Sequence, residues 1–248
     1  MRLKGAFVLI FSWYLISALT DLPHPHEVAE VFFTLLVNPE PVLGKTLVQH
    51  AVASLFRVLA ASFLAFSIAV PLGIISGWNR TLMEFIAPAV EALRPIPPLA
   101  WIPLAYIIFA PLPNTVEVSQ IFIVFVGAFF PCFISVFDYA RNVPEELLEM
   151  AEVFKAPERL IITDIVVPHS LQGIMSGVRI GLGVGWMSII AAEMIATSGE
   201  GLGYFIMVMY NVGGRTAEIV AGMAMIGIIG YMMNWLLLRA ERWVMPWR

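Results

Sequence analysis

Long apolar runs separated by short polar segments dominate the pattern of the chain. Residues 58–78 and 118–137 carry no charged side chain, and mostly apolar runs also cover 5–19, 85–109, 170–196 and 219–238. A helix needs about 20 apolar residues to cross the hydrocarbon core of a bilayer. The pattern therefore predicts an all-α integral membrane protein with six transmembrane helices.

The third of these runs contains the segment RPIPPLAWIP, which begins at Arg94. Its four prolines cannot all fit one straight helix, because each lacks an amide N–H and crowds the preceding turn. They are Pro95, Pro97, Pro98 and Pro103. Broken backbone at membrane depth is tolerated only where it packs in protein or lines a water-filled cavity. We therefore expect this broken span, with Trp101 in it, to line a translocation pathway.

The N-terminal half also contains a polar, acidic segment at 20–50, in which four prolines discourage one long helix. We expect an external loop there, with a short helix from Glu27 to Val37. Before it, Arg2 and Lys4 followed by the apolar run 5–19 fit either a signal peptide or a first span. We favour a retained span, because no clear cleavage site precedes Asp21.

Composition agrees with a membrane protein and narrows the remaining classes. Hydrophobic residues make up 60% and charged residues 13% of the 248 residues, and the length leaves room for a single transmembrane domain, 1–248. No basic patch indicates nucleic-acid binding. The one cysteine, Cys132, lies in an apolar run and is expected to be buried. No cluster of ligands indicates a metal.

The positions of Lys and Arg predict the orientation, because cytoplasmic segments of membrane proteins are enriched in them. If both termini are cytoplasmic, most of these side chains lie in or beside cytoplasmic segments and only three lie outside. The inside group is Arg2, Lys4, Arg80, Arg94, Arg141, Lys155, Arg159, Arg239, Arg242 and Arg248, and the outside group is Lys45, Arg57 and Arg215. The polar segment at about 139–168 is then cytoplasmic.

That cytoplasmic segment predicts a short amphipathic helix. Asn142 is the expected N-cap, Pro144 lies in the first turn, and Glu145 occupies a capping position. Apolar residues then recur at helical spacing beside several acids: Leu147, Leu148, Ala151 and Phe154, with Glu145, Glu146, Glu149 and Glu152. Helices that lie on a lipid surface are usually rich in Lys and Arg. The acidic character favours docking into a protein groove over a helix resting on its own bundle or on lipid.

The same segment resembles the cytoplasmic loop of permease subunits of ATP-binding cassette importers. That loop has a Glu-Ala-Ala, then Gly, then Ile-x-Leu-Pro pattern. This chain has Glu149-Met150-Ala151, then Lys155 in place of the Gly, then Ile165-Val166-Val167-Pro168. The replacement predicts that the turn after the helix is closed by a non-glycine residue in a less favourable conformation.

Other stretches extend the resemblance over most of the chain and narrow it to the nitrate, sulfonate and taurine branch. They are Leu22-Pro23-His24-Pro25-His26-Glu27-Val28, Ser54-Leu55-Phe56-Arg57-Val58, Leu93-Arg94-Pro95-Ile96-Pro97-Pro98-Leu99, Gly127-Ala128-Phe129-Phe130-Pro131, Gly177-Val178-Arg179-Ile180-Gly181-Leu182-Gly183 and Ala191-Ala192-Glu193-Met194-Ile195.

The resemblance implies a type I importer fold in the cell membrane, acting as a homodimer with two cytoplasmic ATPase subunits and an external solute-binding protein. ATP and Mg would bind the partner ATPases, so that this chain needs no cofactor and is no enzyme. Coupling to the ATPases would involve Glu145, Glu149, Ala151, Phe154, Lys155 and Pro168. The implied solute is a small anion of the nitrate, sulfonate or taurine type, with an uncharged heterocycle such as a pyrimidine precursor as the alternative.

Three features of the fifth run are further pathway or gate candidates. Gly173, Gly177, Gly181 and Gly185 form a stripe that permits close helix packing, or a sliding contact or pore wall. Arg179 follows Pro168 by 11 residues, which places it at membrane depth, where it must pair with a carboxylate, meet helix ends or attract an anionic solute. Glu193, near the outer end, is either satisfied by neighbouring helix termini or part of a gate.

Two other function classes are alternatives to an importer permease. A transporter driven by an ion gradient, without an ATPase, would be expected to carry intramembrane acids or histidines and an inverted repeat. A membrane-embedded enzyme would need a cluster of catalytic polar groups at membrane depth. The predicted spans contain few acids, and their polar residues are scattered singly.

Overall fold

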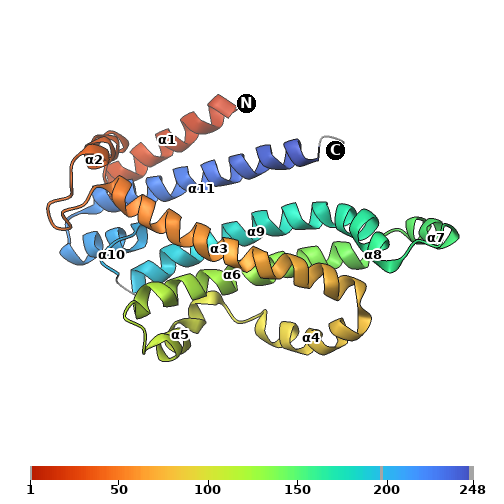
Figure 1. The fold of residues 1–248 in the computed structure, drawn as a ribbon. Helices are drawn as coiled ribbons and strands as arrows, with labels where there is room; N and C mark the ends of the chain where they lie inside the picture. Colours follow the sequence, from red (N-terminus) through yellow and green to blue (C-terminus); the bar gives the residue numbers. More distant parts are fainter. Residues whose placement is uncertain (1, 196–197, 246–248) are drawn as a thin grey trace. The chain divides into compact units, whose positions relative to one another are not determined.

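A computed structural model of the chain describes residues 2–195 and 198–245, which form helices joined by short connections (Figure 1). The chain divides into two compact units. The first comprises Met1–Phe56 and Glu193–Tyr231, and the second comprises Arg57–Ala192 and Met232–Arg248.

The helices follow the predicted apolar runs, with several additions. They are α1 (Arg2–Leu19), α2 (Pro25–Val37), α3 (Leu47–Trp78), α4 (Arg80–Leu93), a 3₁₀ turn (Pro98–Trp101), α5 (Ile102–Phe109), α6 (Thr115–Arg141), α7 (Glu145–Val153), α8 (Glu158–Ile161), a π turn (Ile162–Val166), α9 (Val167–Ile195), α10 (Leu202–Val212) and α11 (Thr216–Val244). The predicted end of the fifth run, Ala196, lies outside the described residues.

Four helices of the described chain are long and apolar enough to cross a membrane: α3, α6, α11, and α9 together with the turns that precede it. A fifth candidate is the bent pair formed by α4 and the segment Pro98–Phe109. In α1, the apolar stretch Ile10–Leu19 is shorter than a span. The structure therefore supplies four to five of the predicted spans, and the count of six stays a prediction.

The third predicted span is broken, as its prolines predicted. The two halves meet at an angle of 92°, and the break lies between Leu93, where α4 ends, and Pro98. Only single turns bridge it: the Ile96 amide donates to the Leu93 carbonyl at 3.1 Å and the Ala100 amide to the Pro97 carbonyl at 2.9 Å. Because proline has no amide hydrogen, the regular ladder cannot pass through this segment.

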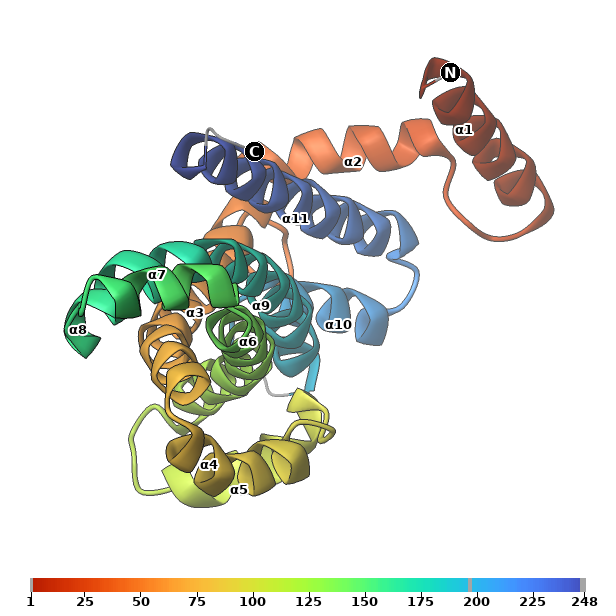
Figure 2. The same cartoon turned by 90° about the vertical axis from the view of Figure 1, so that its right-hand side faces the viewer.

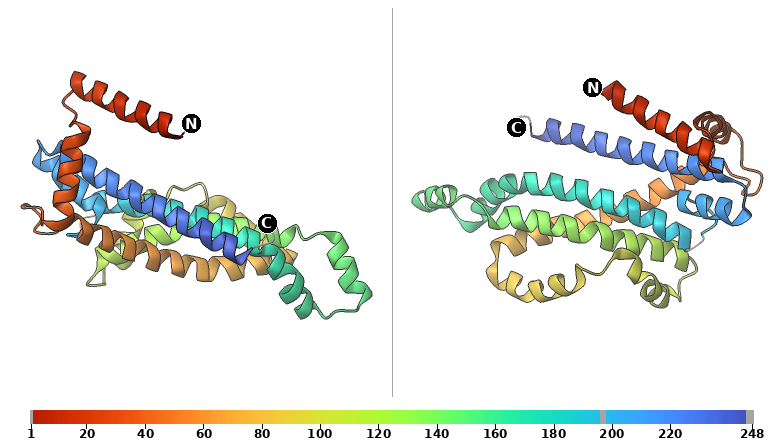
Figure 3. Two further views of the ribbon diagram at one scale, coloured as in Figure 1. Left: turned by 90° about the horizontal axis from the view of Figure 1, so that it is seen from above. Right: turned by 180° about the vertical axis from the view of Figure 1, so that it is seen from behind.

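In the second unit, α6 is the central helix, and α9 runs beside it (Figures 1 and 3). Viewed nearly along their axes, α3, α6 and α9 form one group (Figure 2). A buried cluster of Ala69, Cys132, Phe133 and Val136 joins α3 to α6, so that Cys132 is buried as expected. Aromatic rings stack along α6 at every fourth position from Phe125 to Phe137.

Glycines set the distance between α6 and α9. A Cβ built on Gly177 would lie 2.9 Å from the Cys132 Cα, and one on Gly181 would lie 2.7 Å from the Ala128 carbonyl oxygen. Gly173 approaches the Ser135 carbonyl in the same way, and its own carbonyl accepts a hydrogen bond from Ser135 Oγ at 2.9 Å. The glycine stripe of α9 therefore packs directly on the α6 backbone.

Two helical segments lie outside the predicted runs. The polar segment 20–50 does contain the predicted short helix, α2, but α3 begins at Leu47 and takes up the end of that segment. The 11-residue helix α10 was not predicted, because it is shorter than a span. A signal for it exists in the glycines that flank it, Gly201 at its N-cap and Gly213 at its C-cap, both with positive φ.

The predicted N-cap of the cytoplasmic helix is wrong. α7 begins at Glu145 with Pro144 as its N-cap, whereas Asn142 ends α6 and donates through Nδ2 to the Asp138 carbonyl at 2.7 Å. The physical reason is that Pro144 disfavours helical geometry at Val143, which leaves Asn142 with the preceding helix. A capping motif read from sequence does not say which of two adjacent helices it serves.

Two glycine-to-alanine variants of α9 test the packing of this helix on α6. Gly177→Ala places a methyl group against the α6 backbone and is expected to destabilise the fold by about 1–3 kcal/mol. Gly183→Ala meets no atom within 4 Å and is expected to be neutral or to stabilise by about 0.5–1 kcal/mol. The midpoint of thermal unfolding in mild detergent should fall only for the first variant. Equal midpoints would contradict the packing described here.

Candidate functional site

An open groove of about 500 Å³ lies in the second unit, between the proline break, α6 and α9. Its volume is within the range of pockets that hold small molecules. Most of the lining is apolar, and the charged groups are Arg94 and Asp138. The lining residues are Arg94, Ile96, Pro98, Val126, Gly127, Phe130, Pro131, Ile134, Ser135, Asp138, Ile180 and Val184.

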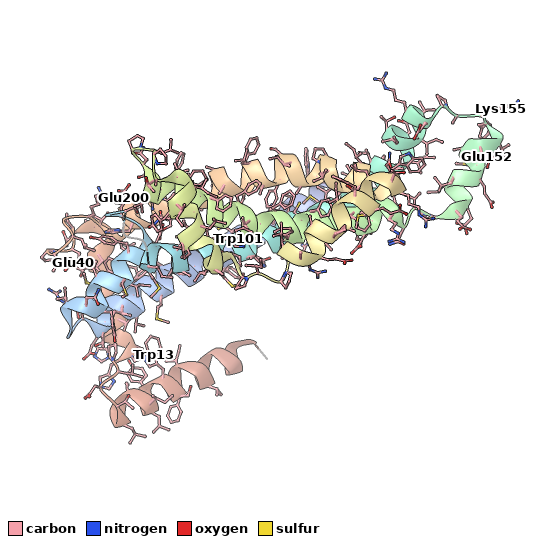
Figure 4. The ribbon with its side chains drawn as sticks, turned by 90° about the horizontal axis from the view of Figure 1, so that it is seen from below. Trp13, Glu40, Trp101, Glu152, Lys155 and Glu200 are labelled. Carbon is pink, nitrogen blue, oxygen red and sulfur yellow. The ribbon has the colours of Figure 1, made fainter. Side chains whose placement is uncertain are left out.

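The predicted pathway residues of the third span meet at this groove only in part. Pro98 lines it, and Pro95 and Pro97 belong to the break that brings Pro98 there. Trp101 ends the 3₁₀ turn that follows the break (labelled in Figure 4), and its ring is edge-on to Phe122 at 6.3 Å between centroids. Its Nε1 is buried, and none of the described residues accepts a hydrogen bond from it.

The groove also contains residues that the sequence did not single out as pathway candidates. The sequence analysis gave neither Asp138 nor Arg94 a role in the pathway. On α9, Ile180 and Val184 line the groove, whereas the candidates Gly177 and Gly181 contact α6. The glycines therefore hold the wall of the groove in place through backbone packing.

Arg179 forms an ion pair inside the second unit. Its Nη1 lies 3.2 Å from Oε2 of Glu241 on α11. The Glu241 side chain is 11% exposed and the Arg179 side chain 35%. The partner of an intramembrane arginine is thus a carboxylate 62 residues away in the chain, which is one of the three alternatives open from sequence.

Glu193 lies in a buried polar network of the first unit. Both of its carboxylate oxygens are within 2.9 Å of Ser54 Oγ, and Oε2 accepts from the Gly203 amide at 3.1 Å. Ser54 Oγ in turn accepts from the Leu202 amide at 2.8 Å. Glu193 is 0% exposed, and its charge is stabilised by the partial positive charge at the N-terminus of α10. Helix termini therefore satisfy this carboxylate, as one sequence reading proposed.

The turn before α10 requires glycine for two reasons. Gly201 has φ +125, a conformation that other residues avoid, and a Cβ there would overlap the carboxyl group of Glu193. Its amide donates to Nδ1 of the buried His50 at 3.1 Å. Sequence reasoning missed Ser54, His50 and Gly201, although the first two are polar positions in a helix that is otherwise largely apolar.

A second carboxylate, Glu40, organises the loop between α2 and α3 (Figure 4). Its Oε2 accepts from the amides of Val42 at 2.6 Å and Leu43 at 2.9 Å. Oε1 lies 3.6 Å from Nη1 of Arg215, which also pairs with Glu218 at 2.9 Å. The hydrogen bond and charge of Glu218, with the charge of Glu40, raise the pKa of Arg215. The loop also carries Lys45, which pairs with Glu200.

The cytoplasmic segment of the prediction, α7 and α8, lies beyond the ends of α6 and α9 (Figures 1 and 3). Its apolar residues are divided between two directions rather than forming one face. Ala151 is buried, and Leu148 packs on the cluster of Ala140, Val143 and Val166. On the other side, Phe154 is 78% exposed. The segment is therefore anchored by one set of apolar side chains and presents another to its surroundings.

The exposed set includes Leu147, Met150, Val153 and Phe154. Among the other predicted coupling residues, Glu145 and Glu149 are exposed on α7, and Pro168 lies in the first turn of α9. The side chain of Trp78 on α3 donates to Glu158 Oε1 at 2.8 Å, which ties α8 to the helix group.

Lys155 closes the turn after α7 with φ +50. The Lys155 amide donates to the Glu152 carbonyl and the Ala156 amide to the Ala151 carbonyl, both at 2.9 Å. This pair of bonds is the Schellman arrangement, in which the left-handed position is usually glycine. A side chain there costs about 1–2 kcal/mol. The prediction of an unfavourable conformation at Lys155 is confirmed.

The chain is similar to a known family of membrane transport proteins. Residues 69–247 match the family described as the inner membrane component of binding-protein-dependent transport systems. The chain belongs to this family. The matched region runs from within α3 to beyond α11 and so includes every residue that lines the groove, the segment α7–α8, Glu193 and the Arg179–Glu241 pair.

Relatives of this family member extend the similarity to nearly the whole chain. A putative ABC transporter permease protein of Methanocaldococcus jannaschii is 37% identical over 94% of this chain and 86% of its own length. The taurine transport system permease protein TauC of Escherichia coli is 33% identical over 97% and 86%. The nitrate import permease protein NrtB of a Synechocystis strain is 32% identical over 96% and 86%. The chain is thus a membrane transport permease of the family that includes these taurine and nitrate permeases.

A substitution of Glu193 tests whether its carboxylate caps α10. Glu193→Gln removes the negative charge and turns an amide group toward N–H donors. The free energy of unfolding should therefore fall by about 1–3 kcal/mol. Hydrogen exchange of the α10 amides should accelerate, because this charge caps the helix. Glu84→Gln is the control, because Glu84 is 68% exposed in its pair with Arg80 and such pairs contribute little. Unchanged exchange in α10 would contradict the capping role.

Proposed function

We propose that this permease imports a small anion, driven by ATP hydrolysis in a separate cytoplasmic ATPase that docks on α7. The observation that carries the proposal is the pair of outward apolar side chains at the end of α7, Val153 and Phe154, which are 79% and 78% exposed. Family membership supports the proposal, because the family is named for transport systems that depend on binding proteins.

Docking on a protein follows from the chemistry of α7. Its outward side combines the apolar residues with Glu145, Glu146, Glu149 and Glu152. Acidic side chains do not favour an anionic lipid surface, which attracts Lys and Arg instead. An amphipathic helix of this kind is suited to a groove in a protein. ATP and Mg would then bind the ATPase, and this chain would contribute mechanical coupling only.

The proposed solute is an anion of the nitrate, sulfonate, taurine or bicarbonate type. The named relatives include permeases of taurine, nitrate and bicarbonate systems, all of which carry anionic groups. Arg94 supplies a cation at the groove, and Pro98 and Gly127 are part of its lining. We propose that the groove is one half of a pathway completed by a second copy of the chain, with two ATPases per dimer.

The proposed orientation places both termini in the cytoplasm, because Lys and Arg are concentrated on that side. α7 then faces the ATPases, and the loop that Glu40 organises, together with α10, faces outward, where an external binding protein would deliver the solute. Binding of ATP would close the ATPase pair, and α7 would transmit that movement to α6 and α9.

The docking proposal is tested by co-purification with the ATPase encoded beside the permease. Phe154→Ala should weaken the complex about thirtyfold, the effect expected for loss of an aromatic residue at an interface centre, about 2 kcal/mol. Phe85→Ala is the matched control, because Phe85 is 83% exposed on α4. Co-purification of Phe154→Ala at the level of the parent protein would contradict docking on α7.

The solute proposal is tested by calorimetry on the external binding protein encoded with the permease. Nitrate, taurine, an alkyl sulfonate or bicarbonate should bind, whereas an uncharged pyrimidine precursor should not. In proteoliposomes with all partners, Arg94→Gln should reduce uptake of the bound anion about tenfold through loss of a charged hydrogen bond, and Arg94→Lys should retain most of it. Binding of the heterocycle alone would overturn the anion proposal and leave docking on α7 untouched.

A further inference from the structure

Lys155 occupies a position that its backbone disfavours. It has φ +50 and is the only non-glycine residue with positive φ in the described ranges, 2–195 and 198–245. A glycine would adopt this conformation without strain. Strained residues persist where the surroundings or a function retain them, and an observed outlier of this kind is a pointer to function.

No ion pair of the Lys155 side chain with a described residue compensates the strain. In the part of the chain that the structure describes, no carboxylate lies within ion-pair distance of the Lys155 ammonium. The side chain is exposed and points away from the α6 and α9 helices (Figure 4). The carbonyls of Met150, Ala151 and Glu152 near the end of α7 already accept from the amides of Phe154, Ala156 and Lys155, so that these three carbonyls do not need the ammonium.

A cation near a helix C-terminus is favourable, but this effect does not account for the choice of position. The interaction with the helix dipole acts over the whole last turn. A lysine at Val153 or Ala156, where φ is not positive, would gain the same attraction without the left-handed conformation. Position 155 places the charge in the exposed turn, directly after Phe154 and without replacing an apolar residue of the exposed set (Figure 4).

The neighbours of Lys155 identify the chemistry of its partner. Phe154 and Val153 form an apolar contact surface, and Lys155 adjoins it as the single cation beside the four acids of α7. At interfaces, apolar residues occupy the centre and charged residues the rim, where opposite charges meet. A rim cation that is unpaired in the free permease is suited to a carboxylate on the protein that covers Phe154.

We propose that Lys155 recognises an acidic residue at the rim of the docking groove of the partner ATPase, and so helps to select that partner. This inference rests on the proposed docking of the ATPase on α7. It assigns to Lys155 a contact that a glycine at the same position cannot make. The charge then acts mainly on the association rate and on salt dependence, whereas Phe154 supplies the larger part of the affinity.

Three variants at position 155 test the role of the charge in binding. Lys155→Gly and Lys155→Asn relieve the left-handed strain and remove the charge, whereas Lys155→Arg keeps both. Affinity of the purified neighbouring ATPase for the permease in nanodiscs is measured by fluorescence titration at 50 mM and 500 mM NaCl. The Gly and Asn variants should bind about fivefold more weakly at low salt, the range of a rim ion pair, and the Arg variant like the parent. At high salt the difference should vanish.

A stability readout excludes a folding explanation. Hydrogen exchange of the α7 amides should slow about fivefold in Lys155→Gly, because the strain is relieved, and remain unchanged in Lys155→Arg. Weaker binding by a better-ordered α7 can then arise only from the lost charge. Parent-like affinity of both the Gly and Asn variants at low salt, beside weak binding of Phe154→Ala, would overturn this inference alone. If Phe154→Ala also binds like the parent, the docking proposal itself fails.

Discussion

The close approach of α6 and α9 is the contact on which the second unit depends. Gly173, Gly177 and Gly181 place the two backbones where any larger residue would collide with α6. Within a bilayer, apolar side chains gain little by leaving lipid, so that helix association relies on close packing and hydrogen bonds. The bond from Ser135 to the Gly173 carbonyl adds to that packing. The position of α9 against α6 in turn fixes two sides of the groove and the point from which α7 and α8 project.

The charged groups of Arg179 and Glu193 are compensated by partners on other helices. Arg179 meets Glu241 of α11, and Glu193 meets Ser54 of α3 and the Gly203 amide in the first turn of α10. A charge left without a partner at membrane depth is costly, and each of these contacts therefore also fixes the position of a helix. The carboxylate of Glu193 serves as a remote cap for α10, whose own N-cap, Gly201, has no side chain to provide one.

The proposed import cycle uses the same helices for the pathway and for coupling. α6 contributes seven residues to the groove lining, from Val126 to Asp138, and ends at Arg141, just before α7. α9 contributes Ile180 and Val184 and begins at Val167, just after α8 and the π turn. A displacement of α7 by the ATPases would therefore reach both walls of the groove through continuous helices. The apolar anchor of Leu148 and Ala151 makes α7 move with them.

The sequence by itself determined the features that depend on local backbone chemistry. Apolar runs located four long helices, the prolines after Arg94 predicted the broken span, and the absence of glycine at Lys155 predicted the strained turn. The tertiary structure decided which distant groups meet. Arg179 pairs with Glu241, and the α9 glycines pack on α6. Asp138 lines the groove, and Glu193 accepts a hydrogen bond from the first turn of α10. Helix and turn signals act over a few residues, whereas these contacts join different helices and exist only once the helices have packed.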